Sequence, residues 1–221
     1  MIQLHGIAIS NYYNKVKFVL LEHGIAFEEV RVMLPITDEA TLACTPNGKV
    51  PFIRTEEGEL SESQVIVEYL AARYPEKAIF PADPFKAAKV RQLAAVLELH
   101  LELVARELYP QLLIGRMTSD ETKARVERTL ARNIEGFKRI ATFAPYVGGE
   151  TFTFADICAY VSLPLIALAT NTVLGHDMLF DAGIDWKAYV KLIEEAHPVA
   201  QRVTADRKAE IAAFTAAAKR A

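Results

Sequence analysis

The chain has 221 residues, of which 52% are hydrophobic and 24% are charged, a composition typical of a soluble globular protein with a sizeable core. This length allows one large domain or two modest ones. With 25 basic and 28 acidic residues the net charge is -3, which gives no electrostatic footprint for nucleic acid.

Cysteines, histidines and apolar runs limit the chemistry further. The two cysteines, Cys44 and Cys158, are far apart in the sequence, which favours a reduced cytosolic protein over a disulfide scaffold. Neither cysteine has metal-ligand spacing and the histidines form no ligand motif, so we expect no metal. No uninterrupted apolar run reaches the roughly 18 residues of a membrane span, and the N-terminus lacks the pattern of a signal peptide. We therefore expect a cytoplasmic protein with no membrane segment.

The first third of the chain alternates between strand and helix patterns. Strand periodicity at residues 2–4 and 30–34 flanks a helical pattern that ends near Gly24, a residue suited to a left-handed helix terminus. A short helix is expected near Asp38–Leu42. A strand–helix–strand unit of this kind predicts two parallel strands.

Residues 50–61 are predicted to form a hairpin. A strand at Val50–Thr55 is followed by Gly58, which turns the chain into a short strand near Leu60. A helical pattern then begins near Val65 and stops at Pro75. Because a hairpin adds antiparallel pairing to the parallel pair, we expect a mixed sheet.

From about Asp83 the pattern is helical. One long helix face covers residues 90–112, and Pro110 is expected to kink it. Capping-box spacings at Thr118–Glu121 and Thr153–Asp156 open two further helices. The second of these is apolar on all sides, so we expect its neighbours to bury it. Further helices are expected at residues 186–196, 198–204 and 207–219.

The composition changes at residues 75–83, where two prolines occur within a short segment. We interpret this segment as a linker between two domains. The predicted fold is an α/β domain with a mixed sheet at residues 1–76, a linker at 77–84, and an all-α domain at 85–221.

Four segments carry a resemblance to the cytosolic glutathione S-transferases. Thr45–Pro51 (TPNGKVP) resembles their Asn-Pro-x-Gly-Lys-Val-Pro segment, and Glu62-Ser63 looks like their Glu-Ser pair before a helix. Phe152–Asp156 looks like the capping box of their buried helix, and His197–Arg202 is similar to their proline-led segment near the C-terminus. Each motif is weak alone, but together they keep the family's order and spacing along nearly the whole chain. The resemblance implies a thioredoxin-like N-terminal domain, a helical C-terminal domain, a homodimer, and glutathione as cosubstrate.

The resemblance implies that Pro51 shapes part of a glutathione site. In the family the bond before this proline is cis, which turns the backbone of Val50 toward the cleft, where a bound peptide can pair with it. Lys49 matches the position whose cation meets the glycyl carboxylate. A solvated loop lysine is the alternative for Lys49.

Glu62 and Ser63 precede a predicted helix, whose N-terminus favours a carboxylate. The resemblance places the γ-glutamyl group of glutathione there. Ser63 and its N–H would bind the α-carboxylate, and Glu62 would help with the ammonium group or orient the site. The alternative is a plain helix cap by Ser61 or Ser63.

The segment Ile9–Val16 resembles the Ser-Pro-Phe-x-x-Arg-Val of serine-type family members, which places Ser10 at the catalytic position. Its hydroxyl would lower the pKa of glutathione's thiol, since a free thiol with a pKa of about 8.5 is mostly protonated at neutral pH. Ser10 also suits a helix N-cap, so capping and catalysis could compete for one hydroxyl. Tyr12 and Tyr13 are rivals, of which Tyr13 fits core packing better, and Asn11 stands where the family has proline and could assist the thiolate.

The second substrate is expected to contact the helical domain around residues 103–116. Tyr109, Gln111 and Arg116 are candidates there, and Asn11 and Tyr12 are candidates from the first domain. Ordinary helix surface is an equally good interpretation of the first three.

The sequence therefore predicts a glutathione transferase that directs the thiolate of glutathione at a small, electrophilic, largely apolar substrate. No cysteine lies at the position of Ser10, which argues against thiol-transferase chemistry. A glutathione-dependent isomerase or dehalogenase that also uses Ser10 is the first alternative. A non-catalytic protein of the same fold that binds partner proteins is the second, and Lys49, Glu62 and Ser63 argue against it. We expect neither nucleic acid nor a membrane as a partner.

Overall fold

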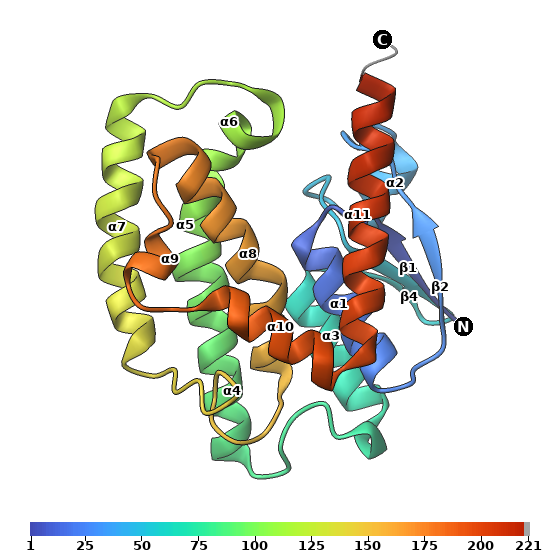
Figure 1. The fold of residues 1–221 in the computed structure, drawn as a ribbon. Helices are drawn as coiled ribbons and strands as arrows, with labels where there is room; N and C mark the ends of the chain where they lie inside the picture. Colours follow the sequence, from blue (N-terminus) through green and yellow to red (C-terminus); the bar gives the residue numbers. More distant parts are fainter. Residues whose placement is uncertain (219–221) are drawn as a thin grey trace. The chain divides into compact units, whose positions relative to one another are not determined.

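The computed structural model describes residues 1–218, which form two compact units (Figure 1). The first unit contains Met1–Ile79 and the residues from Glu194 onward, and the second contains Phe80–Ile193. The described residues from Glu194 to Ala218 cluster with the first unit. The expected domain bounds, 1–76 and 85–221, stay a prediction.

The first unit is built on a mixed four-stranded sheet, as predicted. The strands have the order β2-β1-β3-β4 and comprise β1 (Ile2–Gly6), β2 (Phe27–Arg31), β3 (Phe52–Thr55) and β4 (Gly58–Ser61). Strand β1 is parallel to β2 and antiparallel to β3, which pairs antiparallel with β4. Two strand boundaries differ from prediction: β2 ends at Arg31, before Leu34, and β3 begins two residues after Val50.

Helices connect and cover these strands. They are α1 (Asn11–Glu22), α2 (Glu39–Cys44), α3 (Ser63–Arg73), the 3-10 turn η1 (Pro75–Lys77) and α11 (Pro198–Ala218). The crossover helix α1 allows the parallel pairing of β1 and β2, which a tight turn could not connect. Helix α3 ends before Pro75, as expected, because the residue before a proline disfavours helical geometry.

Helix α11 corrects the prediction of two helices at 198–204 and 207–219. It is continuous from Pro198 to Ala218 and packs against α1 within the first unit (Figure 1). The junction Ala205-Asp206 contains neither glycine nor proline, so nothing there interrupts the backbone hydrogen bonds. Lys219, the predicted end, lies outside the described residues.

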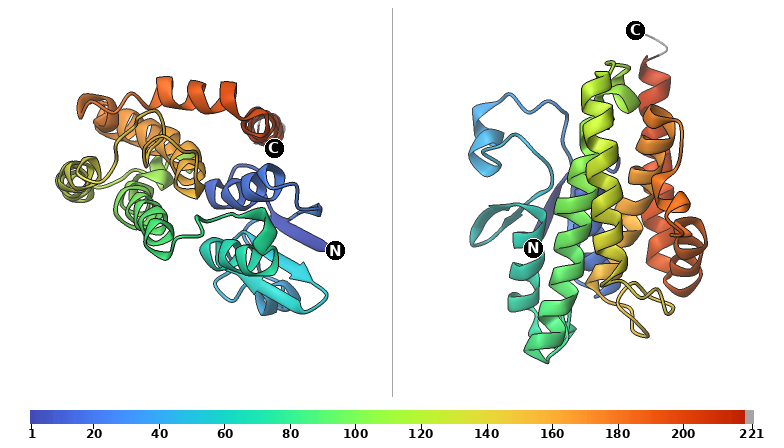
Figure 2. Two further views of the ribbon diagram at one scale, coloured as in Figure 1. Left: turned by 90° about the horizontal axis from the view of Figure 1, so that it is seen from below. Right: turned by 90° about the vertical axis from the view of Figure 1, so that its left-hand side faces the viewer.

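The second unit is built from helices (Figure 2). They are α4 (Pro84–Ala95), the π-helical η2 (Val96–Glu102), α5 (Leu103–Ala105), the 3-10 turn η3 (Arg106–Leu108), α6 (Tyr109–Ile114), α7 (Asp120–Lys138), α8 (Phe154–Leu174), α9 (Met178–Asp181) and most of α10 (Trp186–Ala196), whose last three residues belong to the first unit. Figure 2 shows α7 running alongside the segment from α4 to α5.

The predicted long helix of residues 90–112 is irregular rather than simply kinked. A π-helical segment interrupts it at Val96–Glu102, and a 3-10 turn follows at Arg106–Leu108. Proline lacks an N–H, and its ring clashes with the carbonyl four residues earlier. The disturbance caused by Pro110 therefore falls on the turn that begins at Arg106.

The two predicted capping boxes had different outcomes. Thr153 and Asp156 form the expected reciprocal bonds at the start of α8. The expected cap at Thr118 is wrong by one residue, because Ser119 caps α7 and accepts a hydrogen bond from the N–H of Thr122 at 3.2 Å.

Helix α8 forms the core of the second unit. It is the one helix among the described residues whose length and mean hydropathy would suffice to cross a membrane, although polar residues interrupt its apolar sequence. Its most apolar stretch is 72% buried inside the structure, as in the central helix of a helical bundle.

The absence of a side chain at Gly6 makes room for the ring of Tyr13 in the first unit. Tyr13 is only 3% exposed, and a Cβ atom at Gly6 would lie 2.3 Å from its Cδ2 atom. A side chain cannot be added at Gly6 unless the buried ring moves.

We expect Gly6→Ala to lower the free energy of unfolding by about 1–3 kcal/mol, because the added methyl group overpacks this contact. Gly136→Ala is the control: a Cβ atom there meets nothing within 4 Å, and Gly136 lies within α7. Replacing a helical glycine should raise the free energy of unfolding by about 0.5–1 kcal/mol. Urea unfolding of both variants measures the difference, and equal stability of the two variants would contradict the packing argument.

Candidate functional site

Ser10 is the N-cap of α1, immediately after the turn that leaves β1. Its Oγ atom accepts a hydrogen bond from the N–H of Tyr13 at 3.3 Å. A hydroxyl has one donor hydrogen and two acceptor lone pairs, so capping leaves the O–H of Ser10 available to donate. Capping of α1 and donation to a ligand are therefore compatible at this hydroxyl.

The surroundings of Ser10 favour an anion. The first turn of α1 contains no acidic residue, so the partial positive charge of the helix N-terminus is not offset locally. Asn11 is 2% exposed at the first position of the helix. Tyr12 is partly exposed, and the Nζ atom of Lys15 lies 5.5 Å from the centroid of its ring.

Tyr13 is not available as the activating hydroxyl. Its side chain is buried, as predicted, and its O–H donates to Oε2 of Glu29 at 2.7 Å. Burial, together with this hydrogen bond and the negative charge of Glu29, raises the pKa of Tyr13 far above its ordinary value.

The segment before β3 has the geometry expected from the resemblance. The Val50-Pro51 peptide bond is cis. Strand pairing begins at Phe52, so Val50 lies just outside the ladder and is half-buried, while Lys49 is exposed. The segment is braced by Thr45, whose hydroxyl donates to the carbonyl of Lys49 at 2.7 Å.

Thr45 is a residue whose role the sequence analysis missed. It is 2% exposed, and its carbonyl also accepts the N–H of Gly48, which has a φ of 60°. Two hydrogen bonds thus hold the loop in the shape that presents Lys49 and Val50. In the sequence, the one sign of this role is the position of Thr45 at the start of the TPNGKVP segment.

Glu62 has a backbone conformation that non-glycine residues rarely adopt, with φ 68° and ψ 110°. Such a conformation costs on the order of 1–3 kcal/mol and is concentrated at ligand sites. Glu62 is the N-cap of α3 and forms no side-chain cap hydrogen bond, while Ser63 is the first residue of the helix. The alternative of a plain cap by Ser61 or Ser63 is therefore wrong, and the N-terminus of α3 has no capping side chain.

The register of the sheet brings these segments together. His5, near the end of β1, pairs with Phe52 at the start of β3, and Phe52 pairs with Ser61 at the end of β4. The turn to Ser10, the Val50-Pro51 segment and the Glu62-Ser63 pair therefore leave the sheet at the same end. That end combines a hydroxyl, a backbone segment outside the ladder and two helix N-termini.

The candidates in the second unit have different environments. The hydroxyl of Tyr109 donates to Oε1 of Glu102 at 3.1 Å, and both side chains are buried. Arg116 is exposed, and Gln111 accepts the N–H of Thr118 at 3.0 Å. A role of Tyr109, Gln111 or Arg116 in binding a second substrate stays a prediction.

Comparisons with known proteins agree with this geometry. Residues 4–78 match the family described as "Glutathione S-transferase, N-terminal domain". A glutathione S-transferase of Pseudomonas putida is 41% identical over 214 residues, which cover 97% of this chain and 96% of that protein. A maleylacetoacetate isomerase of Pseudomonas aeruginosa is 37% identical over 89 residues, which cover 37% of this chain and 42% of that protein.

A solved structure shows the same fold. Glutathione transferase F2 of Populus trichocarpa superposes with a TM-score of 0.77, covering 95% of this chain and 100% of that chain at 19% identity. The likeness spans both the mixed sheet and the helices that follow it.

Proposed function

This chain belongs to the glutathione S-transferase family, and from that premise we propose that it binds glutathione at the sheet end that carries Ser10, Val50-Pro51 and Glu62-Ser63. It has the thioredoxin-like N-terminal domain and the helical C-terminal domain of the family. The observation that carries the proposal is the register that aligns His5, Phe52 and Ser61 and so gathers these segments.

Each part of glutathione has a matching group at this site. The backbone of Val50, which lies outside the ladder, pairs with the tripeptide as a short added strand. The N-terminus of α3, with Ser63, binds the α-carboxylate of the γ-glutamyl group, and Glu62 faces its ammonium group. Lys49 meets the glycyl carboxylate.

Ser10 is the proposed catalytic residue. The thiol of bound glutathione releases its proton to solvent, and the O–H of Ser10 donates a hydrogen bond to the thiolate that remains. The N-terminus of α1 favours the same negative charge. Each unit by which the thiol pKa falls corresponds to about 1.36 kcal/mol in favour of the thiolate. The sulfur then uses a lone pair to form a bond to an electrophilic carbon of a small, largely apolar second substrate. Either the bond from that carbon to its leaving group breaks and the leaving group departs as an anion, or the π bond of an activated alkene breaks and the adduct takes up a proton from solvent.

Conjugation is favoured over the alternatives that share the site. The transferase relative matches 97% of the chain, whereas the isomerase relative matches 37% of it. The uncapped N-terminus of α3 and the strained Glu62 favour a ligand site over a purely structural surface. We further propose, from family membership, that the protein works as a cytoplasmic homodimer.

Calorimetric titration with glutathione tests the proposal, with thiolate absorbance followed in the same samples. We expect saturable binding at or below millimolar glutathione and a thiolate band at neutral pH. S-methylglutathione is the control, because it should bind without producing the band. Absence of binding at millimolar glutathione would contradict the proposed function, and a panel of electrophiles compared with isomerase and dehalogenase substrates would separate the reaction types.

A further inference from the structure

Tyr13 connects Ser10 to a group of charges that surrounds the buried Lys17. Its backbone N–H donates to the capping Oγ atom of Ser10 at 3.3 Å, and its hydroxyl donates to Glu29 of β2 at 2.7 Å. The ring between these two ends is 3% exposed and lies against Gly6 of β1. The position of Tyr13 therefore depends on what holds Glu29.

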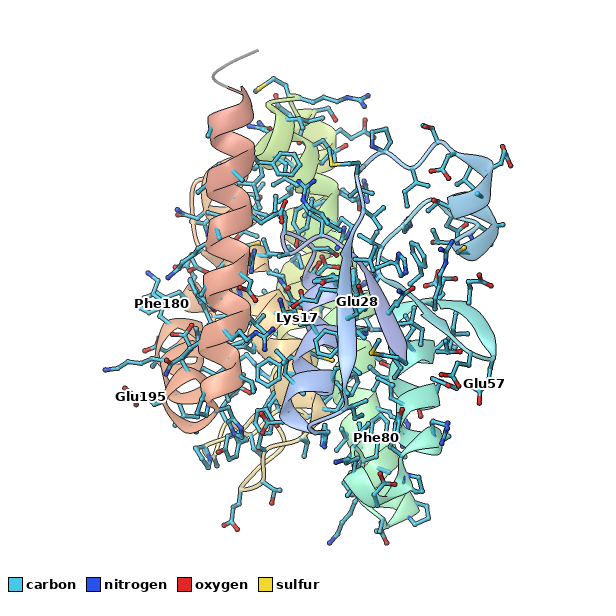
Figure 3. The ribbon with its side chains drawn as sticks, turned by 90° about the vertical axis from the view of Figure 1, so that its right-hand side faces the viewer. Lys17, Glu28, Glu57, Phe80, Phe180 and Glu195 are labelled. Carbon is cyan, nitrogen blue, oxygen red and sulfur yellow. The ribbon has the colours of Figure 1, made fainter. Side chains whose placement is uncertain are left out.

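Lys17 holds the same carboxylate. Its Nζ atom lies 2.6 Å from Oε2 of Glu29 and 2.6 Å from Oδ2 of Asp206 on α11, and its side chain is 1% exposed. Figure 3 shows Lys17 between α11 and strand β2. A buried ammonium group is costly unless ion pairs compensate its desolvation, so this arrangement requires α11 to be in place.

The cluster of charges is balanced. Its members are Lys17 on α1, Glu29 and Arg31 on β2, and Arg202, Asp206 and Glu210 on α11. Arg202 lies 3.4 Å from Glu29 and 3.9 Å from Asp206, while Arg31 pairs with Glu210 at 2.8 Å. Ion pairs thus join the polar face of α11 to α1 and β2 within the first unit.

Helix α11 also borders the turn that presents Ser10. Ala8 of this turn, together with Ala209 and Ala213 of α11, lines an open hollow of about 490 Å³ that the charges also line. The carbonyl of Ala8 accepts a hydrogen bond from Nδ2 of Asn14 at 2.8 Å, which ties the turn to α1.

These contacts form a continuous chain from Ser10 to α11, which we call the Tyr13 relay and which consists of Tyr13, Glu29, Lys17 and Asp206. We propose that the Tyr13 relay positions the hydroxyl of Ser10, so that docking of α11 controls how well the protein ionises glutathione. This inference rests on the proposed role of Ser10.

The physical reason lies in the direction of a hydrogen bond. A hydrogen bond weakens steeply when the donor hydrogen points away from the acceptor. The Tyr13 N–H sets which side of the Ser10 oxygen is occupied by the cap, and thereby where its O–H can point. If the phenol loses its anchor on Glu29, the first turn of α1 gains freedom and the O–H aligns less often with the sulfur.

Tyr13→Phe tests the relay, because it removes one oxygen and changes no charge. We expect the apparent pKa of bound glutathione's thiol, measured from thiolate absorbance against pH, to rise by about one unit, which is about a tenfold loss of thiolate below that pKa. The dissociation constant for S-methylglutathione should stay within about threefold, since its binding does not involve thiol ionisation.

Tyr69→Phe is the matched control. The hydroxyl of Tyr69 also donates to a glutamate, Glu57, at 2.6 Å, but it lies on α3 and outside the relay. We expect its thiolate profile to match that of the unmodified protein. If Tyr13→Phe also leaves the profile unchanged, the relay is refuted. If the unmodified protein shows no thiolate band at saturating glutathione, the proposed function fails instead.

Asp206→Asn tests the far end of the relay and serves if Tyr13→Phe does not fold. Removing an anion would by charge alone favour the thiolate and lower the thiol pKa. The relay predicts the opposite, a rise, because Lys17 loses a partner and α11 loosens. Glu28→Gln removes an equal charge from the exposed surface of β2, where Glu28 accepts a hydrogen bond from Gln3 and takes no part in the ion pairs of α11, so its thiol pKa should fall slightly or stay constant. A fall in Asp206→Asn like that in Glu28→Gln would overturn the inference.

Discussion

Ser10→Ala is expected to lower kcat/KM for glutathione conjugation by about 10- to 100-fold, because a hydrogen bond to a charged group contributes about 1.5–3 kcal/mol. The loss should appear as a higher apparent pKa of the bound thiol. Binding of S-methylglutathione should change little. Stopped-flow thiolate absorbance and steady-state kinetics measure the two effects separately.

This variant also loses a helix cap, which costs about 1 kcal/mol of stability. Ser119→Ala is a matched control, since Ser119 caps α7 by the same kind of hydrogen bond at 3.2 Å and lies outside the site. It should lose similar stability and keep full activity. Equal losses of activity in the two variants, or an unchanged thiol pKa in Ser10→Ala, would show that Ser10 acts only as a cap.

Asp156→Ala is expected to lower the free energy of unfolding by about 3–5 kcal/mol, because each buried donor left without a partner costs about 1–3 kcal/mol. Asp156 is fully buried at the start of α8. Its carboxylate accepts hydrogen bonds from the N–H of Val147 at 2.7 Å, the N–H of Thr153 at 2.7 Å and the hydroxyl of Tyr189 at 2.6 Å. Alanine would leave these donors without a partner in a region closed to water.

The environment of Asp156 shows why the effect is large. Burial raises the pKa of Asp156, while its hydrogen bonds with Tyr189, Val147 and Thr153 act in the opposite direction. Asp83→Ala is the control, because Asp83 caps α4 by one bond to the N–H of Lys86 at the exposed surface. That variant should lose about 0.5–2 kcal/mol. Chemical denaturation of the Asp156→Ala and Asp83→Ala variants gives their free energies of unfolding. Similar losses of stability in the two variants would contradict the argument from burial.

Much of the fold was predictable because its signals are local. Alternation and helical spacing identified the strand–helix–strand unit, Gly58 identified the hairpin, and Pro75 marked the end of α3. These features depend on residues a few positions apart, so the pattern of one segment is enough to predict them. The capping error at Thr118 shows the limit, since Thr118 and Ser119 both had a suitable side chain and only the helix start separates them.

The irregular path of residues 96–108 could not be read from the pattern. The apolar spacing of that segment fits a regular helix, yet the structure contains π and 3-10 turns. In π and 3-10 turns the backbone hydrogen bonds shift by one residue relative to an α-helix, and almost the same side chains still face inward. The spacing of apolar residues therefore does not distinguish these turns from a regular α-helix. The pairing of the buried Glu102 with Arg106 and Tyr109 became visible only in the structure.

The sequence by itself determined the family, the cosubstrate that the family implies and the mixed sheet, because short motifs and local geometry carry that information. The roles of Ser10, Lys49, Pro51 and Glu62-Ser63 stay predictions. The tertiary structure alone decided that Glu62 is strained, that Tyr13 is anchored on Glu29, and that Lys17 is buried. The buried Lys17 forms an ion pair with Asp206, which lies 189 positions further along the chain. A lysine on an amphipathic helix has the same sequence pattern whether it faces water or an ion pair, so only the packing of α11 could reveal its role.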